Sequence, residues 1–134
     1  MRIDGGCLCG HVRYEAEIDP ARVAICHCTD CQTNAATAFG MVASVTDNQF
    51  HLRAGTMTEY DKVVASGTVR TLSFCPHCGT RIHARTKNDP AAFFGLRWGT
   101  ITQRDALPPR IQVWCGSAQP WVFDLAQVPR RMTQ

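Results

Sequence analysis

The sequence has no long apolar run, no internal repeat and no low-complexity segment. None of its 134 residues belongs to an apolar stretch near the roughly 20 positions that a membrane-spanning helix needs. The first ten residues, MRIDGGCLCG, are polar and lack the apolar core of a signal peptide. We therefore expect a cytoplasmic protein with no membrane partner, folded as a single domain over residues 1–134.

Charged residues are also scarce, and no basic run extends beyond Arg130 and Arg131 near the end. The formal net charge of +3 counts every cysteine as a neutral thiol. If seven cysteines bound two zinc ions as thiolates, the protein would become neutral. The mild basicity therefore gives little support for nucleic-acid binding, and we expect no nucleic-acid partner.

Hydrophobic residues, by contrast, make up 45% of the chain, as in a folded protein. Short β-rich stretches lie between glycines and prolines, and residues 11–16 alternate apolar and polar side chains as a half-buried strand does. Strands are predicted at 11–16, 23–26, 38–45, 50–54, 69–74, 80–84, 92–98 and 111–115, and short helical turns at 29–36 and 102–106. This pattern predicts a mainly β fold of short antiparallel strands.

Eight cysteines are the most informative residues present. In a reducing compartment they indicate metal binding or catalysis rather than disulfides. Cys75 and Cys78 in SFCPHCGTRI form a Cys-x-x-Cys-Gly knuckle, and Cys7 and Cys9 in GGCLCGHVRY are the natural complement of a closed tetrahedral zinc site. The alternative, a thioredoxin-like redox pair at Cys75 and Cys78, needs a helix that GTRIHARTK does not predict.

A second cluster, Cys26, Cys28 and Cys31, occurs in CHCTDC. Strand alternation directs Cys26 and Cys28 to one face, and a helical turn brings Cys31 round to meet them. Three ligands leave one coordination position open, as in catalytic zinc sites. Alternatives are a distant fourth ligand such as Cys115 or a histidine, three metal-free thiols, or an iron–sulfur cluster that lacks a ligand. We expect Cys115 to be a small buried residue instead.

The order of these motifs resembles one known family. GGCLCGHVRYEA, CHCTDCQ, SGTVRTLSFCPHCGTRI and VWCGSAQPWV follow one another as in the glutathione-dependent formaldehyde-activating enzyme family, which also includes centromere-protein-V-like proteins. The resemblance covers about residues 5–122. It implies a fold of the β-tent type with two zinc positions: a structural ion on Cys7, Cys9, Cys75 and Cys78, and an active-site ion on Cys26, Cys28 and Cys31. Gln112 is a departure, because many members have a histidine there, and glutamine does not titrate near neutral pH.

These features predict a zinc-dependent carbon–sulfur lyase. It would make or break an S-hydroxymethyl adduct between a glutathione-like thiol cofactor and a small aldehyde such as formaldehyde, with Cys26, Cys28 and Cys31 at the catalytic centre. The resemblance places Ser66, in a serine-bearing loop, near the site. The carboxylates of the thiol require cationic partners, for which the candidates are Arg70, Arg81 and Arg97.

The alternative is a non-catalytic zinc-binding module that binds a protein or a small thiol metabolite. The resemblance permits this, because the centromere-linked branch is not defined by catalysis. Phe39, Trp98, Trp114 and Trp121 either line the pocket or pack in the core.

Overall fold

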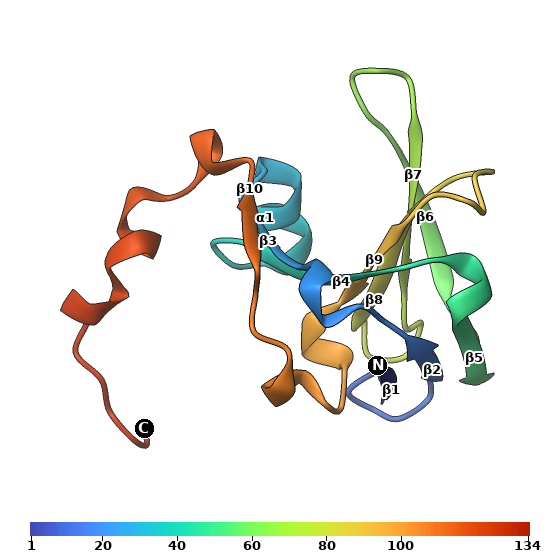
Figure 1. Cartoon of the computed structure of the whole chain (residues 1–134), viewed down its shortest axis with the longest axis horizontal. Coiled ribbons are helices and arrows are strands. Elements are labelled where there is room, and N and C mark those ends of the chain that lie inside the picture. The colour runs from blue at the N-terminus through green and yellow to red at the C-terminus, as the bar shows by residue number, and fades with distance from the viewer.

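The computed structural model is built from two β-sheets (Figure 1). The smaller sheet has the strand order β1-β2-β5, and the larger has the order β10-β3-β4-β9-β8-β7-β6. The strands are β1 (Arg2–Gly6), β2 (Arg13–Glu17), β3 (Val23–Cys26), β4 (Gly40–Val45), β5 (Phe50–Ala54), β6 (Thr58–Val63), β7 (Val69–Phe74), β8 (Arg81–Thr86), β9 (Phe94–Arg97) and β10 (Ile111–Val113). The α-helix is α1 (Thr29–Ala35), and the remaining helical segments are 3₁₀ turns.

The predicted mainly β class is confirmed, and a strand forms in each of the eight predicted stretches. The pairing is antiparallel throughout, except that β10 runs parallel to β3, which the sequence did not predict. The segment predicted as a turn at 29–36 forms α1, and 102–106 contains only the 3₁₀ turn Arg104–Ala106. Two further strands, β1 and β6, were not predicted.

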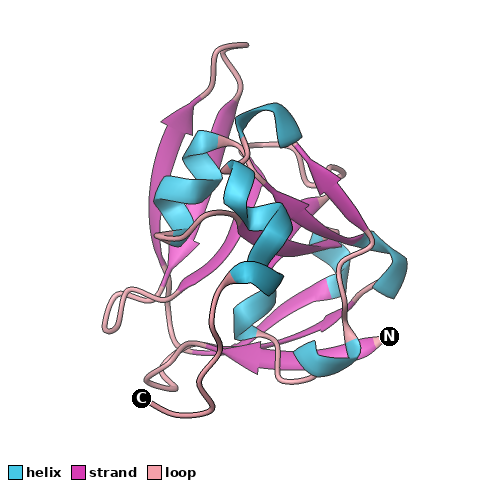
Figure 2. Ribbon diagram, turned by 90° about the vertical axis from the view of Figure 1, so that its left-hand side faces the viewer, coloured by secondary structure: helices cyan, strands magenta, loops and turns pink.

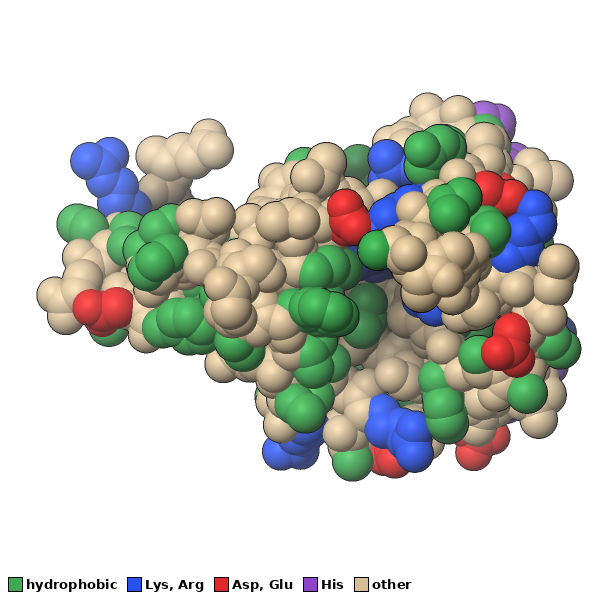
Figure 3. All heavy atoms as spheres, turned by 90° about the horizontal axis from the view of Figure 1, so that it is seen from above, with side chains coloured by type: hydrophobic (Ala, Val, Ile, Leu, Met, Phe, Trp, Pro, Cys, Tyr) green, Lys and Arg blue, Asp and Glu red, His purple; other side chains and the backbone are tan.

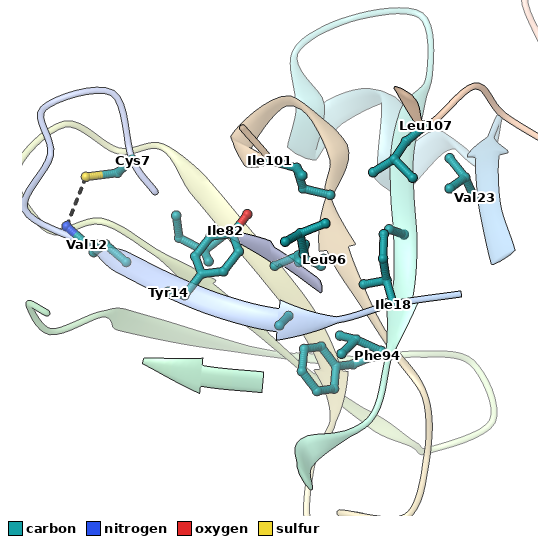
Figure 4. Close-up of a cluster of buried hydrophobic side chains, with 14 of the residues drawn as sticks. Cys7, Val12, Tyr14, Ile18, Val23, Ile82, Phe94, Leu96, Ile101 and Leu107 are labelled. Carbon is teal, nitrogen blue, oxygen red and sulfur yellow. Dashed lines mark hydrogen bonds between the residues drawn. The ribbon is translucent and has the colours of Figure 1, made fainter. Parts of the chain in front are cut away.

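The two sheets share one hydrophobic core (Figure 4). Ile3 and Tyr14 enter it from the smaller sheet, whereas Ala43, Ile82 and Leu96 enter it from the larger sheet. In β2 and β9 buried positions alternate with more exposed ones, because successive side chains of a strand point to opposite faces. The hydroxyl of Tyr14 is satisfied by a 2.7 Å hydrogen bond to Oγ1 of Thr100. This core fixes the two sheets relative to each other.

Helix α1 and the helical turns of the C-terminal segment lie in front of the strands, on the side that faces the viewer in Figure 2. Gln32 of α1 donates hydrogen bonds through Nε2 to the carbonyl oxygens of His27 at 2.7 Å and Ser117 at 2.9 Å, which joins the turn after β10 to the helix. Beyond this point residues 118–134, termed the C-terminal arm, extend away from the sheets (Figure 1). No helix in the structure has the length and apolar character that crossing a membrane requires.

Candidate functional site

Cys7, Cys9, Cys75 and Cys78 converge on one point. Cys7 and Cys9 lie in the turn after β1, and Cys75 and Cys78 lie between β7 and β8. Their four sulfur atoms lie within 4.8 Å of one another, and the Cys7–Cys9 and Cys9–Cys75 Sγ distances are 3.5 and 3.8 Å. Four thiolates bound tetrahedrally to zinc at about 2.3 Å would lie about 3.8 Å apart. The donor set and its spacing therefore fit a closed zinc site.

Local backbone geometry prepares this four-cysteine site. Gly79 adopts a left-handed conformation with φ of +72°, and its N–H donates to the Cys75 carbonyl at 3.0 Å, which closes the knuckle. A side-chain hydrogen bond with Thr80, at 3.2 Å, is the main reason that the pKa of Cys78 falls to about 5. The thiolate that a metal requires is therefore favoured at neutral pH. The chain after Cys78 forms β8 rather than the helix of a thioredoxin-like redox site.

Cys26, Cys28 and Cys31 form a second group of sulfurs within 4.8 Å of one another. Cys26 ends β3, and Cys28 precedes α1 and accepts a hydrogen bond from the backbone N–H of Cys31 at 3.3 Å. The strand end and the first helical turn thus direct all three thiols to one side. No fourth cysteine, histidine or acidic ligand atom lies within that distance of all three, so the group supplies three donors.

In each sulfur group one thiol, Cys9 or Cys31, has a pKa raised to about 12. Burial, followed by the neighbouring thiols of Cys28 and Cys26, raises the pKa of Cys31 to about 12. The three thiols therefore do not ionise together at neutral pH unless a cation offsets their charge. A divalent ion would do so, which makes this donor set suited to a soft metal such as zinc.

Cys115 differs from the sequence expectation, and His27 is a buried histidine held by Gln112. Cys115 is exposed in a 3₁₀ turn and lies outside both sulfur groups, so the expectation of a small buried residue was wrong. His27 is fully buried, and its Nε2 donates to Oε1 of Gln112 at 2.7 Å. The ring packs against Phe39 and Phe123, with centroid distances of 5.8 and 5.5 Å. Gln112 therefore holds the histidine that separates two of the cysteines.

A groove of about 730 Å³ lies between the two sulfur groups. Its lining includes Cys7 and Thr80 from the four-cysteine side and Asn34 from α1, the helix that carries Cys31. None of the three cysteines of the second group lines it. Four arginines and no acidic residue face the groove: Arg13, Arg81, Arg97 and Arg104. This charge distribution favours an anionic ligand.

Arg97 connects the groove with the three-cysteine group. Its Nη2 donates to Oδ1 of Asn34 at 2.7 Å, whereas Nη1 is buried without a hydrogen-bond partner. A Cβ atom built on Gly40 would lie 3.0 Å from this Nη1 and 3.6 Å from Sγ of Cys31. Glycine at position 40 therefore lets the guanidinium and the sulfur approach closely. A buried, unpaired cationic donor at this position is suited to an anionic partner.

The predicted cofactor-binding residues lie in different places. Arg81 lines the groove, and its guanidinium stacks 4.7 Å from the ring centroid of Phe74. Arg70 lies outside the groove and donates to Thr86 Oγ1 at 2.7 Å, and Ser66 lies in the turn between β6 and β7. Phe39 and Trp98 line the groove, but Trp114 and Trp121 are exposed.

Arg13 and Arg104 were missed by sequence reasoning. Arg13 begins β2 and Arg104 begins the 3₁₀ turn Arg104–Ala106, so only the fold brings them to the same groove and no local pattern marks them.

Comparisons with known proteins place these sites in a family context. A model of the family described as "Glutathione-dependent formaldehyde-activating enzyme" matches residues 2–117. A Schizosaccharomyces pombe protein named as an uncharacterized lyase is 26% identical over 95 residues. The matched region is 71% of this chain and 66% of that protein, just under two thirds of its length. A crystal structure of a Rhodobacter sphaeroides protein has a TM-score of 0.63 at 20% identity and covers 82% of this chain and 99% of its own.

The crystal structure shares the fold. The family match is more informative, because it spans most of the chain and includes all seven cysteines of the two sulfur groups. The chain belongs to the glutathione-dependent formaldehyde-activating enzyme family.

Proposed function

We propose that the protein is a zinc-dependent carbon–sulfur lyase. Its substrates would be a glutathione-like thiol and a small aldehyde such as formaldehyde. The enzyme would join them in an S-hydroxymethyl adduct or, in the reverse direction, release them from it. The observation that carries this proposal is the group of three sulfurs with no fourth protein ligand. Family membership and the lyase name of the S. pombe relative support the same class of reaction.

Two ions are implied, with different roles. Cys7, Cys9, Cys75 and Cys78 would hold a structural ion, whereas Cys26, Cys28 and Cys31 would hold the active-site ion. An ion in the second group would supply Lewis-acid chemistry and favour ionised sulfur at neutral pH. The protein residues around it would bind, orient and enclose the organic substrates.

The arginines of the groove would recognise the thiol cofactor by its carboxylates. Glutathione carries two carboxylates, and a guanidinium pairs with a carboxylate through two parallel hydrogen bonds. Arg81, one of the three predicted cofactor-binding residues, lines the groove beside the four-cysteine site. Arg97 offers its unpaired Nη1 closer to Cys31. We propose Arg81 and Arg97 as the principal anchors of the thiol cofactor.

The reaction needs no external oxidant or reductant. The thiol sulfur forms a bond with the carbonyl carbon of the aldehyde, the carbonyl π electrons move to oxygen, and the thiol proton is transferred to that oxygen. The reverse reaction breaks the carbon–sulfur bond. The protein would add mainly proximity and orientation to this intrinsic reactivity. Gln112 would contribute by holding His27 in place and not by exchanging protons.

Exchange spectroscopy on mixtures of formaldehyde and glutathione tests the proposal. The zinc-loaded protein is expected to accelerate interconversion, and Cys28→Ser is expected to abolish the acceleration. Cys115→Ser is the matched control, because Cys115 lies outside both sulfur groups. Arg97→Lys is expected to weaken glutathione binding about tenfold or more, as loss of a hydrogen bond to a charged group does.

Absence of acceleration by the wild-type protein, or equal activity of Cys28→Ser and Cys115→Ser, would overturn the lyase proposal. The alternative would then be a non-catalytic zinc-binding module that holds a small thiol or a protein.

A further inference from the structure

The C-terminal part of the chain has regular turns, but its own side chains are largely exposed. Backbone N–H groups of Ala118, Val122 and Val128 donate to carbonyls three residues earlier, which gives the segment regular turns. No residue after Leu107 is buried. The large apolar side chains exposed here are Ile111, Trp114, Trp121, Phe123, Leu125, Val128 and Met132. Figure 3 shows hydrophobic side chains along the protruding segment and where it joins the body.

The whole molecule exposes more surface than its mass requires. Its accessible area is 8354 Å², whereas a compact monomer of 14.8 kDa is expected to expose about 7,000 Å². The excess of about 1,400 Å² exceeds the roughly 800 Å² that each partner buries in a typical stable protein–protein interface. The exposed area therefore suffices for a stable complex.

The sheet edge next to the arm is a short strand without a charged side chain. β10 ends the larger sheet, and its residues Ile111–Val113 carry no charge. At the opposite edge, β6 carries Glu59, Asp61 and Lys62, which discourage pairing with another strand. An open edge without charged side chains is a template for association.

We propose that the β10 edge and the C-terminal arm together form a dimer interface, occupied by the same surface of a second copy of this chain. An edge strand and an apolar segment side by side are self-complementary, as a two-fold interface requires. The arm also carries both signs of charge, with Asp124 near its middle and Arg130 and Arg131 near its end. A two-fold arrangement can pair these opposite charges, whereas an anionic membrane surface would favour basic residues alone.

The interface would be joined to the three-cysteine group. Phe123 of the arm packs on the ring of His27, which lies between Cys26 and Cys28. Ser117, at the base of the arm, donates through Oγ to the carbonyl of His27 at 3.1 Å. Dimer formation would therefore fix the outer wall of the site. The dimer proposal itself does not depend on the lyase reaction.

Light scattering on the zinc-loaded full chain, over a dilution series, tests this proposal. The wild type is expected at about twice 14.8 kDa. Leu125→Asp and Ile111→Lys each place a charge on a side chain that is about half exposed (50% and 56%), and both variants are expected to shift the mass towards one chain. Val63→Asp, at the charged β6 edge where Val63 is 67% exposed, is the matched control and is expected to remain dimeric.

A wild-type mass of one chain at every concentration would overturn the proposal. So would a dimer that persists in the Ile111→Lys/Leu125→Asp double variant with unchanged far-UV circular dichroism. Co-flotation of the monomer with anionic phospholipid vesicles would assign the surface to a membrane and would equally overturn it. Activity is not the readout, so failure here leaves the lyase proposal standing.

Discussion

Arg97 and Gly40 show how much one pair of residues contributes to the site. The guanidinium reaches past the glycine towards Cys31, and any larger residue at position 40 would contact both groups at 3.0 and 3.6 Å. One nitrogen of Arg97 is fixed by Asn34, and the other is buried without a hydrogen-bond partner. The sequence identified Arg97 as a carboxylate-binding candidate, but its closeness to Cys31 depends on β4 and β9 being neighbours.

His83 is a buried histidine that makes the folded state less stable in acid. It packs against Phe50 and Phe94, and Nη2 of Arg85 approaches its Nε2 at 3.3 Å. Burial, followed by the charge of Arg85, lowers the pKa of His83 from 6.5 to about 3. Nη1 of Arg85 is in turn paired with Oδ1 of Asp47 at 2.9 Å. The native protein therefore holds this imidazole neutral where an unfolded chain would protonate it.

His83→Gln is expected to reduce the acid sensitivity of stability. Between pH 6.5 and about 3 the unfolded state binds the extra proton, so the free energy of unfolding falls as the pH falls. From pH 7 to pH 5 this single group is expected to account for about 2 kcal/mol of the loss. Urea unfolding of both proteins at each pH measures the difference. Identical pH profiles would contradict the assignment, because the cysteine groups are common to both proteins.

At the scale of elements, the four-cysteine site fastens β1 and its following turn to the connection between β7 and β8. Cys75 is fully buried there, and Cys7 nearly so. The three-cysteine group, by contrast, joins the end of β3 to the adjacent α1. The first site links distant parts of the chain, and the second links neighbours. Loss of the first should therefore cost more stability.

Cys75→Ser is expected to lower the melting temperature by about 10 °C or more, and Cys28→Ser by a few degrees. Metal binding at a site that exists only in the folded state is folding free energy, and 1 kcal/mol corresponds to about 4 °C at this chain length. Calorimetry of the zinc-loaded proteins, with Cys115→Ser as the control, measures both shifts. A larger shift for Cys28→Ser would contradict the structural role of the four-cysteine site.

The sequence predicted most strands because apolar alternation marks half-buried strands. β1 and β6 were not predicted, and the reason differs between them. β1 has one large apolar residue and ends in two glycines, and β6 is an edge strand of charged and polar side chains that is almost wholly exposed. Neither has the pattern that burial on one face produces. The parallel pairing of β10 with β3 depends on the long connection between them and has no local signature.

At the scale of the whole molecule, the groove is the feature that no local pattern predicts. The cysteine groups follow from spacing, since each pair or triplet is local in sequence. The groove collects Arg13, Arg81, Arg97 and Arg104 from different strands and turns, without an acidic residue among its lining. Its charge is therefore a property of the fold.

Glutathione binding is expected to weaken as salt concentration rises. The four arginines of the groove would attract the carboxylates of glutathione electrostatically. At 0.1 M salt, dissolved ions screen such an attraction beyond about 10 Å. Binding of 2-mercaptoethanol, a thiol without a carboxylate, should depend little on salt. Calorimetric titration at several salt concentrations measures both. Equal salt dependence of the two thiols would contradict carboxylate recognition by the groove.

The four-cysteine site also sets an order of events during synthesis. Cys7 and Cys9 leave the ribosome before their partners Cys75 and Cys78, and the separation between Cys9 and Cys75 is 66 residues. At about 5–20 residues per second, the first thiols wait several seconds. During that interval they are open to oxidants and to competing metals, and the nascent N-terminal strand has no anchor until the second pair emerges.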